Sequence, residues 1–218
     1  MSAETGSIGT VYGVLLNDPE TIARLGPEFD APPYKAAPRA PVLYIKSRNT
    51  FAADGCSVAV PASSGAVRID GSVGAVIGRR ATRVDAADAL AHVSGYVVVS
   101  DVTLPHDSYY RPAVRQRCRD GFCPMSAANM PDGFDVAAAE VMISIDGVLV
   151  HRRSLSKLVR GLPALIADIT EFMTLEAGDV LLLGLPDGAP LAKPGDRIRI
   201  DVPGLGHVAH DVVEEALS

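Results

Sequence analysis

Glycine and proline divide this chain into short segments, and their spacing limits what the chain can fold into. The 218 residues contain 20 glycines and 16 prolines, and many of the runs between them are rich in valine and isoleucine. β-Branched residues favour strands, whereas Gly and Pro interrupt helices and favour turns. The pattern therefore predicts an α+β domain that is mostly β, with few helices.

We expect a strand wherever an apolar run lies between turn residues. These runs are residues 11–16, 42–45, 58–60, 66–78, 97–99, 180–183, 197–202 and 207–213. Residues 73–77 alternate poorly between apolar and polar, so we expect that strand to be covered on both faces. Asp146-Gly147 lies between two β-rich runs and predicts a hairpin over residues 140–152.

Helices are expected at three places. Residues 21–25 form a single turn, residues 85–92 form a short helix capped by Asp85, and residues 155–172 form a longer one. The longest of them is interrupted at Gly161-Leu162-Pro163, where we expect a kink or a restart.

The chain is expected to form one domain over residues 1–218, because no repeat or change of composition divides it. Residues 26–41 contain five prolines, too many for a helix or an interior strand. We interpret them as an ordered loop or lid. Residues 1–41 are then the first strand with this lid, and residues 42–218 are the core.

The central stretch, residues 95–124, combines groups that bind cations with groups that bind anions. A β-branched run leads to Asp101, and four arginines follow within residues 111–119 with no acidic residue among them. A carboxylate at the end of a strand can hold a hard cation, and an arginine-rich turn can hold the carboxylates of a substrate. The alternative is a buried Asp that caps a turn, followed by a solvated basic loop.

Further candidates lie beside this stretch. Lys46, Arg48 and Asn49 follow the strand at 42–45 and are either exposed polar residues or a ligand-binding cluster. His106 lies in the loop after Asp101 and is the best acid/base candidate among the histidines. The other histidines are expected to be structural; they are His92, His151, His207 and His210.

Composition and charge exclude several classes. The formal charge of −6 argues against non-specific nucleic-acid binding. No apolar run approaches the ~20 residues of a membrane span, and the N-terminus resembles no secretion signal. The three cysteines match no zinc motif. We expect a cytoplasmic protein with reduced thiols, no membrane or nucleic-acid partner and no organic cofactor.

Several segments, taken in order, resemble the fumarylacetoacetate hydrolase family. They are AVIGR (75–79), GYVVVSDVTLPHD (95–107), CRDGFCP (118–124), LEAGDVLLLGLPDG (175–188) and KPGDRIRI (193–200). Within the family, the chain resembles the N-terminal half of two-part isomerase/decarboxylases of 4-hydroxyphenylacetate (homoprotocatechuate) degradation. That resemblance rests on PPYKAAP (32–38), YIKSRNT (44–50), LPHDSYYRPA (104–113) and CRDGFCP. It implies a mixed β-sandwich roll, usually dimeric, acting on small oxo or enol dicarboxylates with Mg²⁺ or Mn²⁺.

The resemblance also implies where a metal would bind. In the family, a Glu-x-Glu pair and one Asp hold a divalent ion, which stabilises the enolate of a 2-oxo acid. The corresponding residues here are Asp70, Ser72 and Asp101. Asp70 is one methylene shorter than Glu, and Ser72 carries no charge. We therefore expect Mg²⁺ or Mn²⁺ to bind weakly in this chain.

Other family positions have also changed. Thr21 stands where a lid histidine is usual, and Leu185 replaces a threonine that faces the substrate carboxylate. Arg117 aligns with a lysine; it can bind a carboxylate bidentately but cannot act as a base. The catalytic candidates are His106 and Arg117. The substrate-binding candidates are Lys46, Arg48, Asn49, Arg117, Asp120 and Leu185.

Three functions remain open. The leading one is an isomerase/decarboxylase subunit of aromatic catabolism, acting on 2-hydroxyhepta-2,4-diene-1,7-dioate or 5-oxopent-3-ene-1,2,5-tricarboxylate. The second is a hydrolase of a C–C bond in an acylpyruvate. The third is a catalytically silent subunit. As partners we expect a small di- or tricarboxylate substrate and either a second copy of the chain or a homologous metal-bearing subunit.

Overall fold

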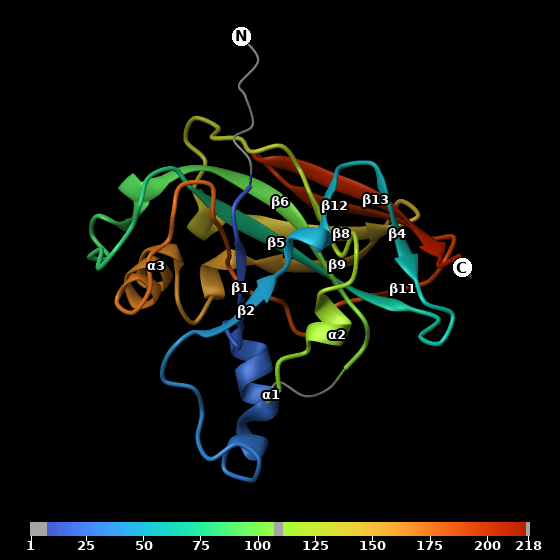
Figure 1. The fold of residues 1–218 in the computed structure, drawn as a ribbon, viewed down its shortest axis with the longest axis horizontal. Helices are drawn as coiled ribbons and strands as arrows, with labels where there is room; N and C mark the ends of the chain where they lie inside the picture. The colour runs from blue at the N-terminus through green and yellow to red at the C-terminus, as the bar shows by residue number, and fades with distance from the viewer. Residues whose placement is uncertain (1–7, 107–110, 217–218) are drawn as a thin grey trace.

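The computed structural model describes residues 8–106 and 111–216, which form two sheets (Figure 1). The first sheet runs in the order β2 (Val42–Lys46), β1 (Val11–Leu15), β10 (Val180–Leu182), β5 (Val67–Ile77), β6 (Val93–Thr103), β7 (Cys123–Met125) and β3 (Phe51–Ala53), with β11 (Leu191–Ala192) paired to β5. The second runs β4 (Cys56–Val60), β13 (Gly206–Glu214), β12 (Arg197–Val202), β8 (Glu140–Ile145) and β9 (Val148–Ser154). The expected mostly β fold is confirmed.

The main core lies between the two sheets. On β5, Ile69 and Val73 belong to a buried cluster that also contains residues of β8, β12 and β13. A Cβ atom on Gly71 would lie only 2.8 Å from Val141 on β8 and 3.1 Å from Ile200 on β12. Gly71 therefore allows the sheets to approach closely. Because side chains alternate along a strand, Asp70 and Ser72 face the opposite side of β5.

The first sheet curls strongly around that opposite side. In a flat sheet, the four strand spacings from β2 to β6 would separate these strands by about 19 Å. Yet the Lys46 ammonium on β2 lies 2.6 Å from the Asp101 carboxylate on β6. The concave face encloses a second buried cluster, made of Val11, Val76, Val97, Val99, Cys123, Met125, Val180 and Leu182. By alternation, Asp70 and Asp101 lie on this concave face.

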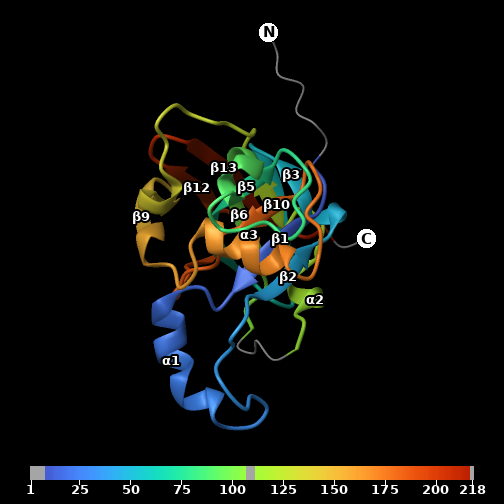
Figure 2. The same cartoon turned by 90° about the vertical axis from the view of Figure 1, so that its left-hand side faces the viewer.

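The first helix, α1 (Pro19–Phe29), is longer than the single turn expected at residues 21–25. Asp18 caps it by accepting a hydrogen bond from the Thr21 amide at 2.9 Å. The helix continues through Pro27 because two of its own side chains on either side of that residue, Leu25 and Phe29, are buried in one apolar cluster. It projects away from the two sheets in both views (Figures 1 and 2).

Residues 85–92 do not form the expected α-helix. They form turns and a 3₁₀ helix, η2 (Ala89–His92), in which the Asp88 amide donates to Asp85 and the Ala91 amide to Asp88. Hydrogen bonds between residues i and i+3, which define a 3₁₀ helix, are common in segments that are too short to propagate an α-helix. The short α2 (Val114–Arg117) lies within the basic stretch.

Two other expectations about local structure are confirmed. Residues 155–172 restart as predicted, with a 3₁₀ helix η4 (Leu155–Lys157) followed by α3 (Leu162–Thr170). The Asp146-Gly147 turn joins β8 to β9, with φ angles of 52° and 79° that suit a tight hairpin. Two further 3₁₀ helices are η1 (Arg48–Thr50) and η3 (Val136–Ala138).

Asp101 lies within β6 and not at its end, because the strand continues to Thr103. The two tyrosines of the LPHDSYYRPA segment fall within residues 107–110, outside the described residues. Among the residues that the structure describes, no helix is long and apolar enough to cross a membrane.

Candidate active site

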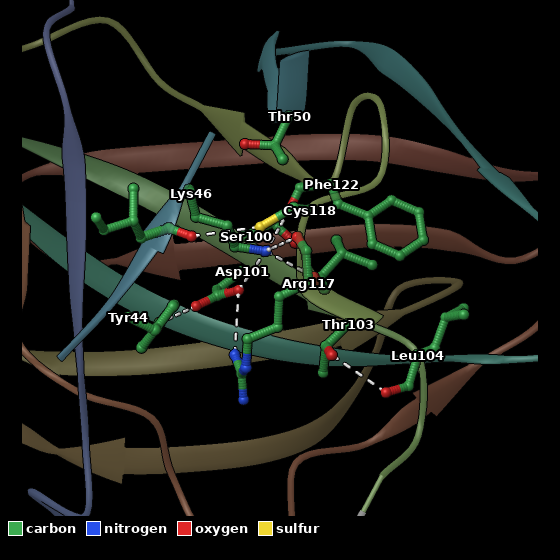
Figure 3. Close-up of polar contacts among 12 residues, drawn as sticks. Tyr44, Lys46, Thr50, Ser100, Asp101, Thr103, Leu104, Arg117, Cys118 and Phe122 are labelled. Atoms are coloured by element: carbon green, nitrogen blue, oxygen red, sulfur yellow. Dashed lines mark hydrogen bonds and ion pairs between the residues drawn. The ribbon is translucent and has the colours of Figure 1, made fainter. Parts of the chain in front are cut away.

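Three side chains, two from β2 and one from α2, converge on Asp101 (Figure 3). The Lys46 Nζ atom lies 2.6 Å from Asp101 Oδ1, and both side chains are fully buried. The Tyr44 hydroxyl donates a hydrogen bond to Oδ2. The Arg117 Nη1 atom lies 3.7 Å from Oδ1, and its guanidinium stacks over the Tyr44 ring at 4.6 Å from the centroid. Asp101 Oδ2 thus accepts a hydrogen bond from Tyr44, while Oδ1 lies beside two cations but accepts no hydrogen bond from the described residues.

Lys46 is a buried partner of Asp101 and not the exposed cation that its place after a strand suggested. Besides the ion pair, its ammonium donates to three backbone carbonyls, those of Val102, Arg117 and Phe122, at 2.7, 3.0 and 2.9 Å. An ammonium has three N–H groups, so none is left for a ligand. Lys46 therefore fixes the charge and position of Asp101, and the structure gives it no contact with the cleft.

Tyr44 reaches Asp101 because its partner residue on the neighbouring strand is a glycine. Tyr44 on β2 pairs with Gly13 on β1, and both lie on the concave face. A Cβ atom on Gly13 would collide with the Tyr44 ring. Glycine at this position lets the ring lie across β1 and carry its hydroxyl toward β6.

Asp70 lies directly opposite Asp101 in the β5–β6 ladder. Its side chain is buried. Burial, followed by the negative charge of Asp101, raises the pKa of Asp70 to about 7, and the nearby guanidiniums of Arg117, Arg68 and Arg153 limit this rise. The Asp70 carboxyl can therefore gain or lose a proton near neutral pH.

A cleft of about 360 Å³ opens over Asp70. It is lined by Arg24, Arg68, Asp70, His106, Arg117 and the loop of residues 185–189 that follows β10. An ion pair of 2.8 Å between Arg24 on α1 and Asp187 on that loop joins the helix to the wall of the cleft. A second, more apolar hollow of about 470 Å³ shares His106 and Arg117 with the cleft.

The expected metal positions meet, but their chemistry does not suit a divalent ion. Asp70, Ser72 and Asp101 lie on adjacent strands, as predicted. However, Asp101 is held by Lys46 and Tyr44, and the Ser72 hydroxyl donates to the Gly184 carbonyl at 3.1 Å. Within residues 8–106 and 111–216, no group of three His, Cys, Asp or Glu side chains could hold a metal ion. The residues present do not fit Mg²⁺ or Mn²⁺.

The other expected site residues separate into two groups. His106 and Leu185 line the cleft beside Arg117. Asn49 and Asp120 instead tie two loops together, since the Asn49 amide donates to the Asp120 carboxylate at 2.6 Å and to the Cys118 carbonyl at 3.1 Å. Arg48 is exposed in η1. The cleft lining includes none of Arg48, Asn49 and Asp120.

Sequence reasoning missed Arg153, which approaches the same region from β9 of the second sheet. Its Nη2 atom donates to the Gly184 carbonyl at 2.7 Å, while its Nε and Nη1 atoms are buried with no hydrogen-bond partner among the described residues. Burial lowers the pKa of Arg153 to about 10, so it remains charged at neutral pH. The signal in the sequence was the pair Arg152-Arg153 at the end of the predicted hairpin, because adjacent side chains of a strand point to opposite faces.

Comparison with known proteins agrees with this geometry. Residues 10–213 match the family described as "Fumarylacetoacetate (FAA) hydrolase C-terminal". The 4-hydroxyphenylacetate degradation bifunctional isomerase/decarboxylase of Escherichia coli is 35% identical over 208 residues, which are 95% of this chain and 48% of that protein. The chain thus spans about half the length of the curated relatives it matches with this activity.

Two solved structures share the fold. The 5-carboxymethyl-2-hydroxymuconate delta-isomerase from Mycobacterium smegmatis has a TM-score of 0.82 and 26% identity, covering 96% of this chain and 80% of that one. The fumarylpyruvate hydrolase from Pseudomonas aeruginosa, in complex with Mn²⁺ and pyruvate, has a TM-score of 0.81 and 22% identity, covering 95% and 91%. With sequence, fold and the cleft over β5 and β6 in agreement, this chain belongs to the fumarylacetoacetate hydrolase family.

Proposed function

We propose that this chain is an isomerase/decarboxylase subunit of aromatic catabolism that acts on a small dicarboxylate in its keto or enol form. The substrates would be 2-hydroxyhepta-2,4-diene-1,7-dioate, for ketonisation, and 5-oxopent-3-ene-1,2,5-tricarboxylate, for decarboxylation. One observation carries the proposal: a single cleft places the guanidiniums of Arg68 and Arg117 beside an imidazole, that of His106, and a carboxyl group, that of Asp70. The similarity to the E. coli isomerase/decarboxylase supports it.

Ketonisation needs few chemical groups. A proton leaves the enol oxygen, another is added to carbon, and the negative charge that develops on the oxygen must be stabilised. His106 would move the proton, because an imidazole titrates near neutral pH. Arg117 would hold a substrate carboxylate and stabilise the developing charge. A catabolic enzyme of this kind would act in the cytoplasm.

A hydrolase of an acylpyruvate is the weaker candidate. Hydrolysis of a C–C bond needs a base that activates water. The position of the usual lid histidine is Thr21, and its hydroxyl hydrogen-bonds to Asp18 at 3.2 Å and Asp187 at 3.4 Å. A threonine hydroxyl engaged in this way cannot serve as the base.

A catalytically silent subunit is the third candidate, and two observations favour it. The expected metal positions do not suit a divalent ion, and the chain matches only 48% of its E. coli relative. In this case the chain would pair with a homologous metal-bearing subunit and supply packing, not turnover.

Assaying the purified chain separates these candidates. The absorbance of the conjugated dienol should fall when the chain ketonises 2-hydroxyhepta-2,4-diene-1,7-dioate. The assay is run on the chain alone and on the chain co-expressed with a homologue that carries Glu-x-Glu. Turnover by the chain alone supports the isomerase, and His106→Gln should then reduce kcat strongly. Turnover only with the homologue, unchanged by His106→Gln in this chain, would establish the silent subunit and contradict our proposal.

A further inference from the structure

We infer that Arg68 binds the second, distal carboxylate of the substrate, so that the cleft selects dicarboxylates over monocarboxylates of the same length. This inference rests on the proposed function, because it takes the heptadienedioate as the ligand. Neither the sequence motifs nor the comparisons give Arg68 a role.

Arg68 lies in the cleft at the end where β6 leaves the sheet. It precedes Asp70 by two residues on β5, so the two side chains project from the same face of the strand, with their Cα atoms about 7 Å apart. Arg68 pairs with Thr103, the last residue of β6, and its Nη1 atom donates to the His106 carbonyl in the loop beyond, at 3.3 Å. The guanidinium is therefore displaced from Asp101 toward the end of β6.

The guanidinium of Arg68 retains one edge for a ligand. Among the described residues, its Nε and Nη2 atoms form no hydrogen bond, and neither belongs to the buried polar atoms without a partner. The side chain is only partly buried, so solvent reaches this edge. Nε and Nη2 share one edge of a guanidinium and can donate two parallel hydrogen bonds to the two oxygens of one carboxylate.

The charges of the cleft lining also favour a carboxylate at Arg68. Arg24 forms an ion pair of 2.8 Å with Asp187, and Arg117 lies 3.7 Å from the Asp101 carboxylate. Within residues 8–106 and 111–216, Arg68 is the one guanidinium of the lining that forms no ion pair. A cation in a cleft without a fixed counter-ion attracts an anionic ligand.

The position of Arg68 suits the length of the proposed substrates. Both carry a carboxylate far along the carbon chain from the oxo or enol group. If Arg117 holds the carboxylate beside that group, the receptor for the distal carboxylate must be displaced from the Asp70–Asp101 pair. The displacement of Arg68 along β5, about 7 Å, is of the order of the extended heptadienedioate itself.

Calorimetry with pimelate and heptanoate tests the inference without requiring turnover. Pimelate is the saturated counterpart of the heptadienedioate, and heptanoate lacks one of its carboxylates. We expect the wild type to bind pimelate about tenfold or more tightly than heptanoate, the scale of a charge-assisted pair. In Arg68→Gln the ratio of the two affinities should fall to about one, because only the shared carboxylate is still bound.

Two control variants separate a defined receptor from general positive charge. Arg199→Gln removes an exposed arginine of β12 that is paired with Asp201 and lies outside the cleft lining, and it should keep the ratio of the wild type. Arg24→Gln removes a cation of the same lining that is paired with Asp187, and it should lower the ratio less than Arg68→Gln does. If Arg68→Gln fails to fold, Arg68→Lys takes its place and should still lower the ratio, since lysine cannot form the two parallel bonds.

The inference is overturned if the wild type binds neither ligand, if it binds both alike, or if either control variant lowers the ratio as much as Arg68→Gln. A preference for pimelate that depends on Arg68, without ketonisation of the dienedioate, would leave the inference standing and remove only the proposed function. Ketonisation with a KM that Arg68→Gln does not change would do the reverse.

Discussion

At the scale of single residues, the cleft depends on charges that are fixed inside the protein. Lys46 shows why this was hard to predict: a lysine after a short strand is usually exposed, and only contacts with residues far along the chain bury it. That Asp70, Ser72 and Asp101 lie close together could be predicted from the order of the family motifs in the sequence. Arg153 could not, because sequence alternation does not say which of two adjacent arginines points inward.

Replacing Lys46 by methionine should destabilise the fold by about 3–5 kcal/mol, because Asp101 would remain buried with a lost partner. Urea denaturation followed by circular dichroism measures this change. Lys35→Met, at an exposed lysine, should cost less than about 0.5 kcal/mol. The double variant Lys46→Met/Asp101→Asn should recover part of the loss; a double variant no more stable than the single one would mean that the ion pair is not the cause.

Asp70 should make the protein less stable as pH rises. Its folded pKa of about 7 lies above the ordinary value of 3.8, so the folded state holds this proton more tightly than the unfolded state. Stability from this group is complete below about pH 4 and is lost as pH rises through the folded pKa of about 7, on the order of 4 kcal/mol in total. Asp70→Asn should remove this part of the pH dependence, measured as urea midpoints at pH 5 and pH 8. Asp132→Asn, at an exposed carboxylate, should leave the dependence in place.

At the scale of elements, the strands followed local patterning and the helices depended on tertiary contacts. The β8–β9 hairpin formed where Asp146-Gly147 predicted it, because its turn geometry is set by those two residues. Helix α1 ran past Gly26 and Pro27, two residues that local rules place outside helices, because Phe29 is buried at its end. Residues 85–92 had a good cap and composition but formed only 3₁₀ turns.

Two glycines in adjacent elements should respond to alanine in opposite directions. Gly13→Ala on β1 should displace the Tyr44 ring from Asp101 and cost about 1–3 kcal/mol, the range for overpacking. Gly26→Ala on α1 meets no atom within 4 Å and should stabilise the protein by about 0.5–1 kcal/mol. Thermal unfolding of the two variants checks both signs. A neutral Gly13→Ala would show that the ring does not need that space.

At the scale of the whole molecule, the curl of the first sheet was beyond sequence reasoning. Strand positions indicate which segments are extended, but not that β2 closes onto β6 through Lys46 and Tyr44. The sheet order also reflects distant pairings, such as β1 with β10. The mostly β class could be predicted from turn residues and β-branched runs, because those are local properties.

We expect the chain to associate, since it spans about half the length of its curated isomerase/decarboxylase relatives. Size-exclusion chromatography with light scattering should give a dimer mass for the chain alone or a heteromer when a homologue with Glu-x-Glu is co-expressed. Given both options, we expect the heteromer to dominate. A chain that elutes as a monomer at micromolar concentration, with or without the homologue, would contradict this expectation.

The parallel pairing of β1 with β10 also constrains how the protein can be made. Val11 pairs with Val180 on β10, so the edge of β1 that faces β10 has no partner until most of the chain has left the ribosome. Until then, β1 can pair only with β2, and its other edge is open to wrong partners. Ribosome-bound chains that stop before β10 should therefore leave β1 open to protease, and chains that extend well past it should protect β1.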